Sequence, residues 1–362
     1  MVNLYDLSLA EMTEFLAGLG ESPYRARQLY AWLYGKGEND FDAMTDLPAA
    51  VREKLKGGAR ADGPVLAGTL ASSDGQTTKH LFELGDGNFI ETVFMKYKDR
   101  NSICLSSQAG CRMGCKFCAS GELGLKRDLS PAEMALQVML SEREAGARTK
   151  NIVLMGVGEP LDNYENVKKF IENITDDHGR DLSRRAITLS TCGIVQGIDR
   201  LAKELPQVNL AVSLHAPNDA LRVKIMPVTK KYGIHEVVEA TQRHFMATRR
   251  RSTFEYALID GFNDSIGHAR ELAALLKGMN CLVNLIPLNY ISGDGPISGD
   301  GTNDWEPIIS TVPMIGPSQC LTAERFREEL GRRHVPATVR KSLGADIEAA
   351  CGQLRLKAAR TQ

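Results

Sequence analysis

Apolar residues recur at helical spacing through the first 60 residues. The first such stretch runs from Leu9 to Leu19 and ends at Gly20, and the second follows Ser22-Pro23. A third, at 51–55, follows a proline. The pattern predicts three amphipathic helices, followed by a glycine-rich linker over 57–64.

From residue 65 the periodicity becomes that of strands. Short β runs are expected at 81–84, 89–95 and 102–107, with a hairpin turn at Gly85-Asp86-Gly87 between the first two. Further apolar strands then alternate with helical stretches. The expected strands are 152–155, 187–190, 209–214, 254–258 and 282–286, and the expected helices are 132–144, 167–174, 198–203, 234–245 and 268–276. This alternation predicts a parallel sheet with helices outside it.

Counting 102–107, the pattern gives six strand–helix units. We therefore expect an α/β protein: a partial (β/α)6 barrel with a small helical N-terminal accessory domain and a short β extension. Residues 291–318 interrupt the pattern with a repeated Ser-Gly-Asp-Gly and three prolines, which favours a disordered surface loop over an inserted flap. A helix near 323–330 and a strand near 337–339 follow. The expected divisions are 1–60, 61–100, 101–290, 291–318 and 319–362.

Composition narrows the class of protein. The chain has 362 residues, 43% hydrophobic and 25% charged, as in ordinary globular proteins. No apolar stretch reaches the about 18 residues of a membrane span, and the N-terminus lacks the features of a secretory signal, so we expect a cytoplasmic protein. The net charge of −1 does not indicate a nucleic-acid binder, and three short basic runs are interpreted as solvated turns. Eight cysteines are too few for a disulfide scaffold and point to metal or redox chemistry.

Three of these cysteines lie within eight residues. Cys111, Cys115 and Cys118 have the spacing C-x3-C-x2-C. A structural zinc site needs four protein ligands, and no fourth Cys or His lies nearby at ligand spacing. An iron–sulfur cubane also takes four ligands, so three cysteines leave one iron open to a small molecule. The spacing favours such a centre, with a zinc loop or buried thiols as the alternative.

Polar residues also follow other predicted strands. Gly156-Val157-Gly158-Glu159-Pro160 comes directly after strand 152–155. A lone Ser or Asn at the end of a strand is usually a helix cap. Ligand contact is indicated only because these residues would all lie at the same edge of the sheet, where the carboxyl ends of the parallel strands meet. The residues at such ends are Ser190, Ser213, Leu214, His215 and Asn289.

The cysteine loop resembles the signature of the radical S-adenosylmethionine (SAM) superfamily, and Phe117 fits the aromatic residue common there. Gly158-Glu159-Pro160 resembles the superfamily's GGEP element, with the first glycine displaced. The resemblance implies a [4Fe–4S] cluster on the three cysteines that, when reduced, cleaves SAM to methionine and a 5′-deoxyadenosyl radical. It also implies that SAM is bound by Gly158, Glu159, Ser190, Ser213, Leu214, His215 and Asn289.

Two further cysteines narrow the resemblance. Cys104 lies on the strand before the cysteine loop, and Cys351 lies near the C-terminus in Ala349-Ala350-Cys351-Gly352-Gln353. Taken alone, each would be interpreted as an inert buried thiol. Together with the helical N-terminal unit, Glu91-Thr92-Val93 and the run 213–219, they resemble the bacterial radical SAM methyltransferases that methylate carbon 2 of adenine in 23S ribosomal RNA and certain transfer RNAs.

Carbon 2 of adenine is electrophilic, so the electrophilic methyl group of SAM cannot be transferred to it directly. The resemblance implies that Cys351 first takes a methyl group from one SAM, a displacement suited to a thiolate. A second SAM, cleaved at the cluster, yields a radical that removes hydrogen from this S-methyl group. The methylene radical adds to adenine and gives a covalent protein–RNA adduct. Cys104 then forms a disulfide with Cys351 and releases the product, and Glu91 takes the ring proton, although a partly exposed strand carboxylate is more often a surface charge.

The same resemblance implies the partners. The N-terminal helices would hold the RNA mainly by its shape, and the adenine would leave its stack to react. A flavodoxin-like protein would donate electrons. We expect a monomer that does not contact a membrane.

Two alternatives stay open. Carbon-8 methylation of the same ribosomal adenine shares both cysteines and the cluster, although Gly158-Glu159-Pro160 and Glu255 favour carbon 2. The other alternative is a non-catalytic iron–sulfur or zinc protein that recognises RNA. Cys192, Cys281 and Cys320 have no assigned role and are expected to be buried thiols.

Overall fold

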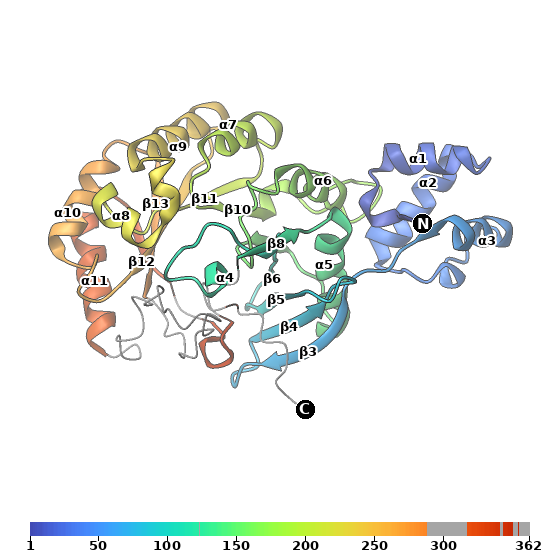
Figure 1. The fold of residues 1–362 in the computed structure, drawn as a ribbon, viewed down its shortest axis with the longest axis horizontal. Helices are drawn as coiled ribbons and strands as arrows, with labels where there is room; N and C mark the ends of the chain where they lie inside the picture. Colours follow the sequence, from blue (N-terminus) through green and yellow to red (C-terminus); the bar gives the residue numbers. More distant parts are fainter. Residues whose placement is uncertain (123, 288–316, 341–342, 350–353, 355–362) are drawn as a thin grey trace, which may run out of the picture.

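The computed structural model describes residues 1–122, 124–287, 317–340, 343–349 and 354. Figure 1 shows a small helical unit, in blue, beside a larger body built on one curved sheet. Asn289 and Cys351 lie outside the described residues, as do 291–316 of the expected insertion. In the described part of the chain, every helix is too short or too polar to cross a membrane.

The first 60 residues form the helical unit, and the three predicted helices are confirmed. Ser8 and Glu11 form a capping box at the start of the first helix. Strand β1 pairs in parallel with β2, so the two ends of the unit meet. Gly57 and Gly58, expected in a linker, are instead the last residues of a helix. The elements are β1 (Val2–Asn3), α1 (Leu9–Gly18), α2 (Pro23–Tyr30), the π-helical η2 (Ala31–Lys36), α3 (Ala49–Gly58) and β2 (Ala59–Arg60).

Ten strands form one open sheet, in the order β14-β13-β12-β11-β10-β9-β6-β5-β4-β3. Neighbouring strands are parallel from β14 to β6, whereas β6, β5, β4 and β3 are antiparallel. Their bounds are β3 (Val65–Ala71), β4 (Thr77–Glu83), β5 (Phe89–Lys96), β6 (Asn101–Cys104), β9 (Asn151–Leu154), β10 (Ile187–Thr191), β11 (Asn209–Ser213), β12 (Ser252–Leu258), β13 (Cys281–Pro287) and β14 (Ala337–Val339).

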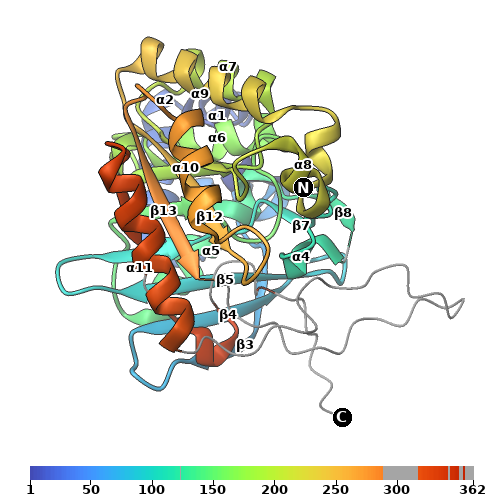
Figure 2. The same ribbon diagram turned by 90° about the vertical axis from the view of Figure 1, so that its left-hand side faces the viewer.

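Helices follow the parallel strands and cover the outer side of the sheet (Figures 1 and 2). Apolar residues of both layers, such as Ile152 and Leu189 on strands and Val167 and Leu201 on helices, form one buried core. The expected partial (β/α)6 barrel is confirmed, and β14 adds another parallel strand at its edge. The helices are α5 (Pro131–Ala145), α6 (Tyr164–Ile174), α7 (Val195–Glu204), α8 (Asp219–Ile225), α9 (Ile234–Thr248), α10 (Ile266–Leu275) and α11 (Pro317–Arg332).

The chain around the cysteine loop differs from the prediction. The strand expected over 102–107 ends at Cys104, and the chain continues into β7 (Gln108–Gly110), which pairs with β8 (Leu125–Asp128). The cysteine loop and the short helix α4 (Ala119–Glu122) therefore lie between β7 and β8. The sequence does not indicate β7, β8 or α4, because elements of three or four residues are too short to show a periodicity.

Candidate functional site

The cysteine loop is fastened by its own backbone. At its start, Cys111 N donates a hydrogen bond to Gly124 O at 3.1 Å. Gly110 has a φ of +79°, and a Cβ at this position would lie 1.9 Å from the same oxygen, so only glycine fits there. In the middle of the loop, Lys116 N donates to Ile225 O at 3.0 Å. The loop is thus held both at the β7–β8 pair and at the end of α8.

The three thiols of the loop influence one another. Burial and nearby Cys118 raise the pKa of Cys111 to about 12, and burial, Cys118 and Cys111 raise the pKa of Cys115 well above its usual value. Thiolates at these positions therefore need a cation beside them. A structural zinc site is closed by four protein ligands. The loop offers three free, partly exposed thiols, so this donor set fits a [4Fe–4S] cluster with one open iron better than one zinc ion.

The Gly156–Pro160 loop after β9 packs directly on the chain that leads to the cysteines. A Cβ at Gly156 would lie 2.6 Å from Leu105 C and O, and one at Gly158, where φ is +109°, would lie 2.7 Å from Gln108 N. Ser107 N donates to Val157 O at 2.8 Å. Both glycines are needed because another backbone occupies the space of a side chain. The loop is thereby fixed next to the cysteine loop, as expected for a shared site.

Glu159 joins the ends of β9 and β10. Its buried carboxylate accepts hydrogen bonds from Leu161 N at 3.0 Å and from Cys192 N at 2.7 Å. Burial raises the pKa of Glu159, against the effect of these donors. Ser190, half-buried on β10, lies two residues before Cys192. The carboxylate expected to contact SAM thus also holds two strand ends in place.

His215 connects the end of β11 to the cysteine loop. Its ring lies 4.6 Å, centroid to centroid, from the ring of Phe117 in a T-shaped contact. Ala257 N donates to His215 Nδ1 at 2.9 Å, so the neutral ring carries its proton on Nε2. Burial, together with the nearby Arg222 charge, lowers the pKa of His215 to about 3. Leu214, the preceding residue, is buried, and Ser213 is half-buried; all three lie at the strand end where the sequence predicts SAM contacts.

Arg222 of α8 is a site residue that the sequence analysis missed. Its buried guanidinium donates to the backbone oxygens of Cys192 at 2.6 Å and of Ser213 and Leu214 at 3.2 Å each, and to Thr229 Oγ1 at 3.0 Å. Burial lowers the pKa of Arg222. One cation therefore fixes the ends of β10 and β11. The sequence shows only that Arg222, like Lys224, alternates with apolar residues over 221–226.

Cys104 and Glu91 lie on neighbouring strands. Both are buried, with 9% and 3% of their surface exposed. The expectation that Glu91 is partly exposed is wrong, because β5 is an interior strand and Glu91 faces the covered side of the sheet. The Lys79 ammonium lies 3.1 Å from Glu91 Oε1. Cys104 packs in an apolar cluster with Val93 and Met95.

The chain on both sides of Cys351 reaches this cluster. Ala349 and Leu354 pack in the same apolar cluster as Cys104. Ser120, in α4 directly after the cysteine loop, donates through its hydroxyl to Leu354 O at 3.3 Å. Ala349 and Leu354, the described residues on either side of 350–353, thus both lie beside Cys104, and Leu354 also contacts the short helix that follows the cysteine loop.

The remaining cysteines follow the expectation where they are described. Cys192 and Cys281 are buried free thiols. Cys192 contributes to the site through its backbone, which Glu159 and Arg222 both contact. The side chain of Cys320 lies outside the described part of the structure.

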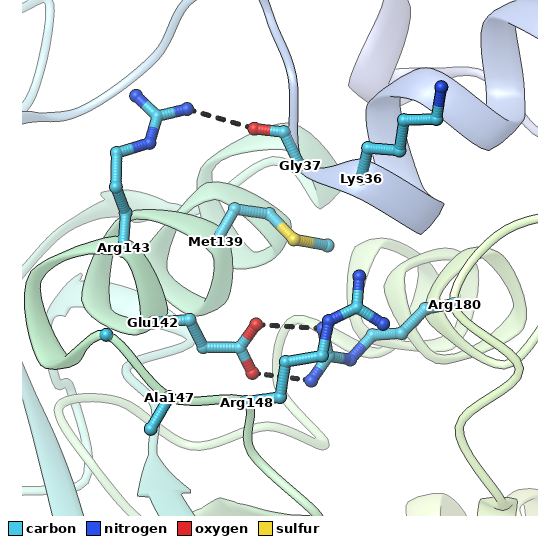
Figure 3. A pocket seen from close by; sticks show the side chains of 9 residues that line it. Lys36, Gly37, Met139, Glu142, Arg143, Ala147, Arg148 and Arg180 are labelled. Carbon is cyan, nitrogen blue, oxygen red and sulfur yellow. Dashed lines mark hydrogen bonds and ion pairs between the residues drawn. The ribbon is translucent and has the colours of Figure 1, made fainter.

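A separate hollow of about 280 Å³ lies between the helical unit and the barrel (Figure 3). Arg180 pairs with Glu142 through hydrogen bonds of 2.8 and 2.5 Å, and Arg143 donates to Gly37 O at 2.9 Å. The hollow is near the end of α5 and the start of β9, at the amino ends of the strands. Arg143 and Arg148, which donates to Gly35 O, fasten the helical unit to the barrel, whereas the Arg180–Glu142 pair lies within the barrel domain. The hollow lies away from the site described above.

Comparisons with known proteins agree with this geometry. The family described as "Ribosomal RNA large subunit methyltransferase N-terminal domain" matches residues 2–60, and "Radical SAM superfamily" matches residues 105–273. A crystal structure of a radical SAM methyltransferase from Sphaerobacter thermophilus is similar with a TM-score of 0.90 and 44% identity, covering 99% of this chain and 100% of that one.

Curated relatives match nearly the whole chain. It is 46% identical to the probable dual-specificity RNA methyltransferase RlmN of Desulforamulus reducens, over 98% of this chain and 96% of the relative. It is 47% identical to the protein of the same name from Pelotomaculum thermopropionicum, over 99% and 92%. The chain therefore belongs to the dual-specificity RNA methyltransferase RlmN family and is a radical SAM RNA methyltransferase.

Proposed function

We propose that this enzyme methylates carbon 2 of a specific adenine in 23S ribosomal RNA and in transfer RNAs, through a methyl group carried by Cys351. The observation that carries the proposal is the course of the C-terminal segment. Ala349 packs with Cys104, and Leu354 O accepts a hydrogen bond from Ser120, two residues after Cys118. The residues on either side of Cys351 are thereby anchored, Ala349 beside a buried thiol and Leu354 beside the helix that follows the cysteine loop.

The residues of the rim would hold the cofactors. Cys111, Cys115 and Cys118 would bind the [4Fe–4S] cluster, and SAM would lie against the strand ends. When bound, one SAM would supply the methyl group and a second SAM, with the cluster, would supply the hydrogen-abstracting radical. The cluster would also accept the electron that the adduct gives up. The proposed SAM contacts are Gly158, Glu159, Ser190, Ser213, Leu214, His215 and Asn289.

The chain's own residues carry the carbon and release it. The Cys351 thiolate forms a bond to the methyl carbon, which leaves the sulfur of SAM. After the resulting methylene has joined carbon 2, Glu91 takes the proton from that carbon. The Cys104 sulfur then attacks the Cys351 sulfur, and the electron pair of the broken sulfur–carbon bond stays on the methylene, which takes a proton to become the methyl group. A disulfide remains, which a thiol reductant reopens.

The other parts of the chain have supporting roles in this proposal. The helical unit of residues 1–60 holds RNA mainly by its shape. The core domain of residues 101–290 carries the chemistry. Residues 61–100 link this domain to the helical unit, and the C-terminal part, residues 319–362, supplies Cys351. The enzyme works as a cytoplasmic monomer that receives electrons from a flavodoxin-like donor.

The test uses the full-length protein with reconstituted cluster, SAM and a transcribed fragment of 23S ribosomal RNA. We expect mass spectrometry to find one added methyl group on the Cys351 peptide, absent from a Cys111→Ala variant, and 2-methyladenosine in the digested RNA. A Cys104→Ala variant should keep the methylated peptide and accumulate the covalent adduct on a denaturing gel. A Cys351 that is never methylated contradicts the mechanism, and 8-methyladenosine would assign the carbon-8 reaction instead.

A further inference from the structure

Lys79 on β4 contacts two groups of the proposed site at once. Its Nζ lies 3.1 Å from Glu91 Oε1 and donates a hydrogen bond to Glu348 O at 3.3 Å. The side chains of Lys79 and Glu91 are only 9% and 4% exposed. Glu348 lies three residues before Cys351. One buried ammonium group therefore joins the proposed base to the backbone of the segment that carries the methyl group.

The sheet register explains why these groups meet. Lys79 lies opposite Val93 of β5, and Val93 lies opposite Cys104 of β6. Glu91 is two residues from Val93, so its side chain is on the same face of the sheet. Lys79 and Glu91 are thus diagonal cross-strand neighbours, a position that long side chains bridge. Lys79, Glu91 and Cys104 share one face and lie within two residue positions of each other along the strands.

The C-terminal segment covers this face through several contacts. A Cβ at Gly344 would lie 2.8 Å from Thr77 Cγ2, and Asp346 Oδ2 accepts a hydrogen bond from Ser73 N at 2.8 Å. Ala349 packs against the apolar residues around Cys104. The hydrogen bond from Lys79 is one anchor among these, so the segment does not depend on Lys79 alone.

Stability alone is a weak reason for a buried ion pair at this place. Removing two charges from water costs free energy, and apolar residues of similar volume often stabilise a protein as well or better. A lysine also offers three donors on a flexible stem, so it can hold two acceptors at once. The pair is therefore better explained by what it holds in place.

We propose that Lys79 is a positioning residue: its ammonium orients the Glu91 carboxylate towards the adenine held by Cys351. This inference rests on the proposed function. Methylation of Cys351 uses the thiol and SAM, so it does not require Lys79. Removal of the proton from carbon 2 requires an oriented base, so this later step slows without Lys79, and the covalent adduct persists.

The test compares Lys79→Met, which keeps the length of the side chain without its charge, with Lys79→Arg, which keeps the charge. Lys96→Met, at an exposed position at the end of β5, is the matched control. Each full-length protein is reconstituted and given SAM and the 23S fragment. Three quantities are measured: methylation of Cys351 by mass spectrometry, the adduct on a denaturing gel, and 2-methyladenosine after digestion. Thermal unfolding is recorded for every variant.

For Lys79→Met we expect unchanged methylation of Cys351, an accumulated adduct and product formation slowed by about tenfold or more. Lys79→Arg should recover part of the rate, and Lys96→Met should behave as the wild type. Product at the wild-type rate from Lys79→Met overturns the inference, and so does a parallel loss of all three readouts with a lower melting temperature, which would show a structural role. If the wild type forms 2-methyladenosine but Lys79→Met behaves otherwise than expected, only the inference about Lys79 is contradicted. If the wild type forms no methylated Cys351, the proposed function is contradicted as well.

Discussion

The cysteine loop (residues 111–118) and the face of the sheet that carries Lys79, Glu91 and Cys104 differ in burial and in what holds them in place. The loop cysteines are only half-buried and lie between two short strands, where backbone hydrogen bonds and a glycine hold the chain. Cys104 is buried in the middle of a ten-stranded sheet among apolar side chains. In the proposed function the loop thiols bind a bulky cluster and so need an open position, whereas Cys104 reacts with one partner and is best shielded from others. The difference in burial agrees with these two proposed kinds of sulfur chemistry.

The Gly156–Pro160 loop lies between the two regions and touches both. Val157 packs in the apolar cluster of Cys104, and Glu159, two residues on, accepts a hydrogen bond from Cys192 N on the side of the cysteine loop. Because Gly158 has no space for a side chain, this loop has one position relative to both regions. The Gly156–Pro160 loop therefore connects the two regions through packing on one side and a hydrogen bond on the other.

Removing a loop cysteine gives the largest expected effect and tests whether the regions are separable. We expect Cys115→Ala to abolish iron binding and turnover, measured by iron analysis and product formation, because the cluster needs all three thiolates. The free energy of unfolding of the iron-free protein should change by less than about 1 kcal/mol, since the site is half-buried. Cys281→Ala, in buried β13, should show the reverse: full iron content and a stability loss of about 1 kcal/mol. Iron retained by Cys115→Ala would contradict the assignment.

Arg222 tests how the rim beside the cysteine loop is supported. Arg222→Leu leaves the buried oxygens of Cys192, Ser213 and Leu214 without this donor, so we expect a loss of about 3 kcal/mol in the free energy of unfolding. Urea denaturation measures it. Arg243→Leu is the control, because Arg243 forms an exposed ion pair with Asp199 at 2.9 Å, and such pairs contribute less than about 1 kcal/mol. Equal losses in both variants would show that Arg222 does not support the strand ends.

His215 gives a smaller, pH-dependent effect. Its folded pKa of about 3 lies below the ordinary value of 6.5, so the unfolded chain binds a proton between these pH values that the folded chain does not. Stability due to neutral His215 is therefore complete above pH 6.5 and decreases as the pH falls towards 3, by about 1.4 kcal/mol at pH 5.5. Urea denaturation of the wild type from pH 7 to 5 should show a loss of about 2 kcal/mol in the free energy of unfolding that His215→Gln does not show. The same pH dependence in both proteins would place His215 in a solvated environment.

The sequence by itself determined most of the barrel, and it predicts the chemistry of the cysteine loop. The ligand spacing of Cys111, Cys115 and Cys118 is local, and local spacing is readable without a structure. The parallel strands and their helices are long enough for their apolar periodicity to be visible. The strand-end positions of Glu159 and His215 follow from the same periodicity, because the ends of parallel strands share one rim.

Only the tertiary structure decided which groups meet across the chain. Lys79 contacts Glu348 across 269 positions, and Ser120 contacts Leu354 across 234; no spacing pattern encodes such pairs. The burial of Glu91 depends on a C-terminal segment that covers β4, β5 and β6, and Arg222 acquires its role only where two strand ends converge. Local residue patterns fix what a segment can bind, whereas burial and charge pairing depend on neighbours that folding brings from elsewhere in the chain.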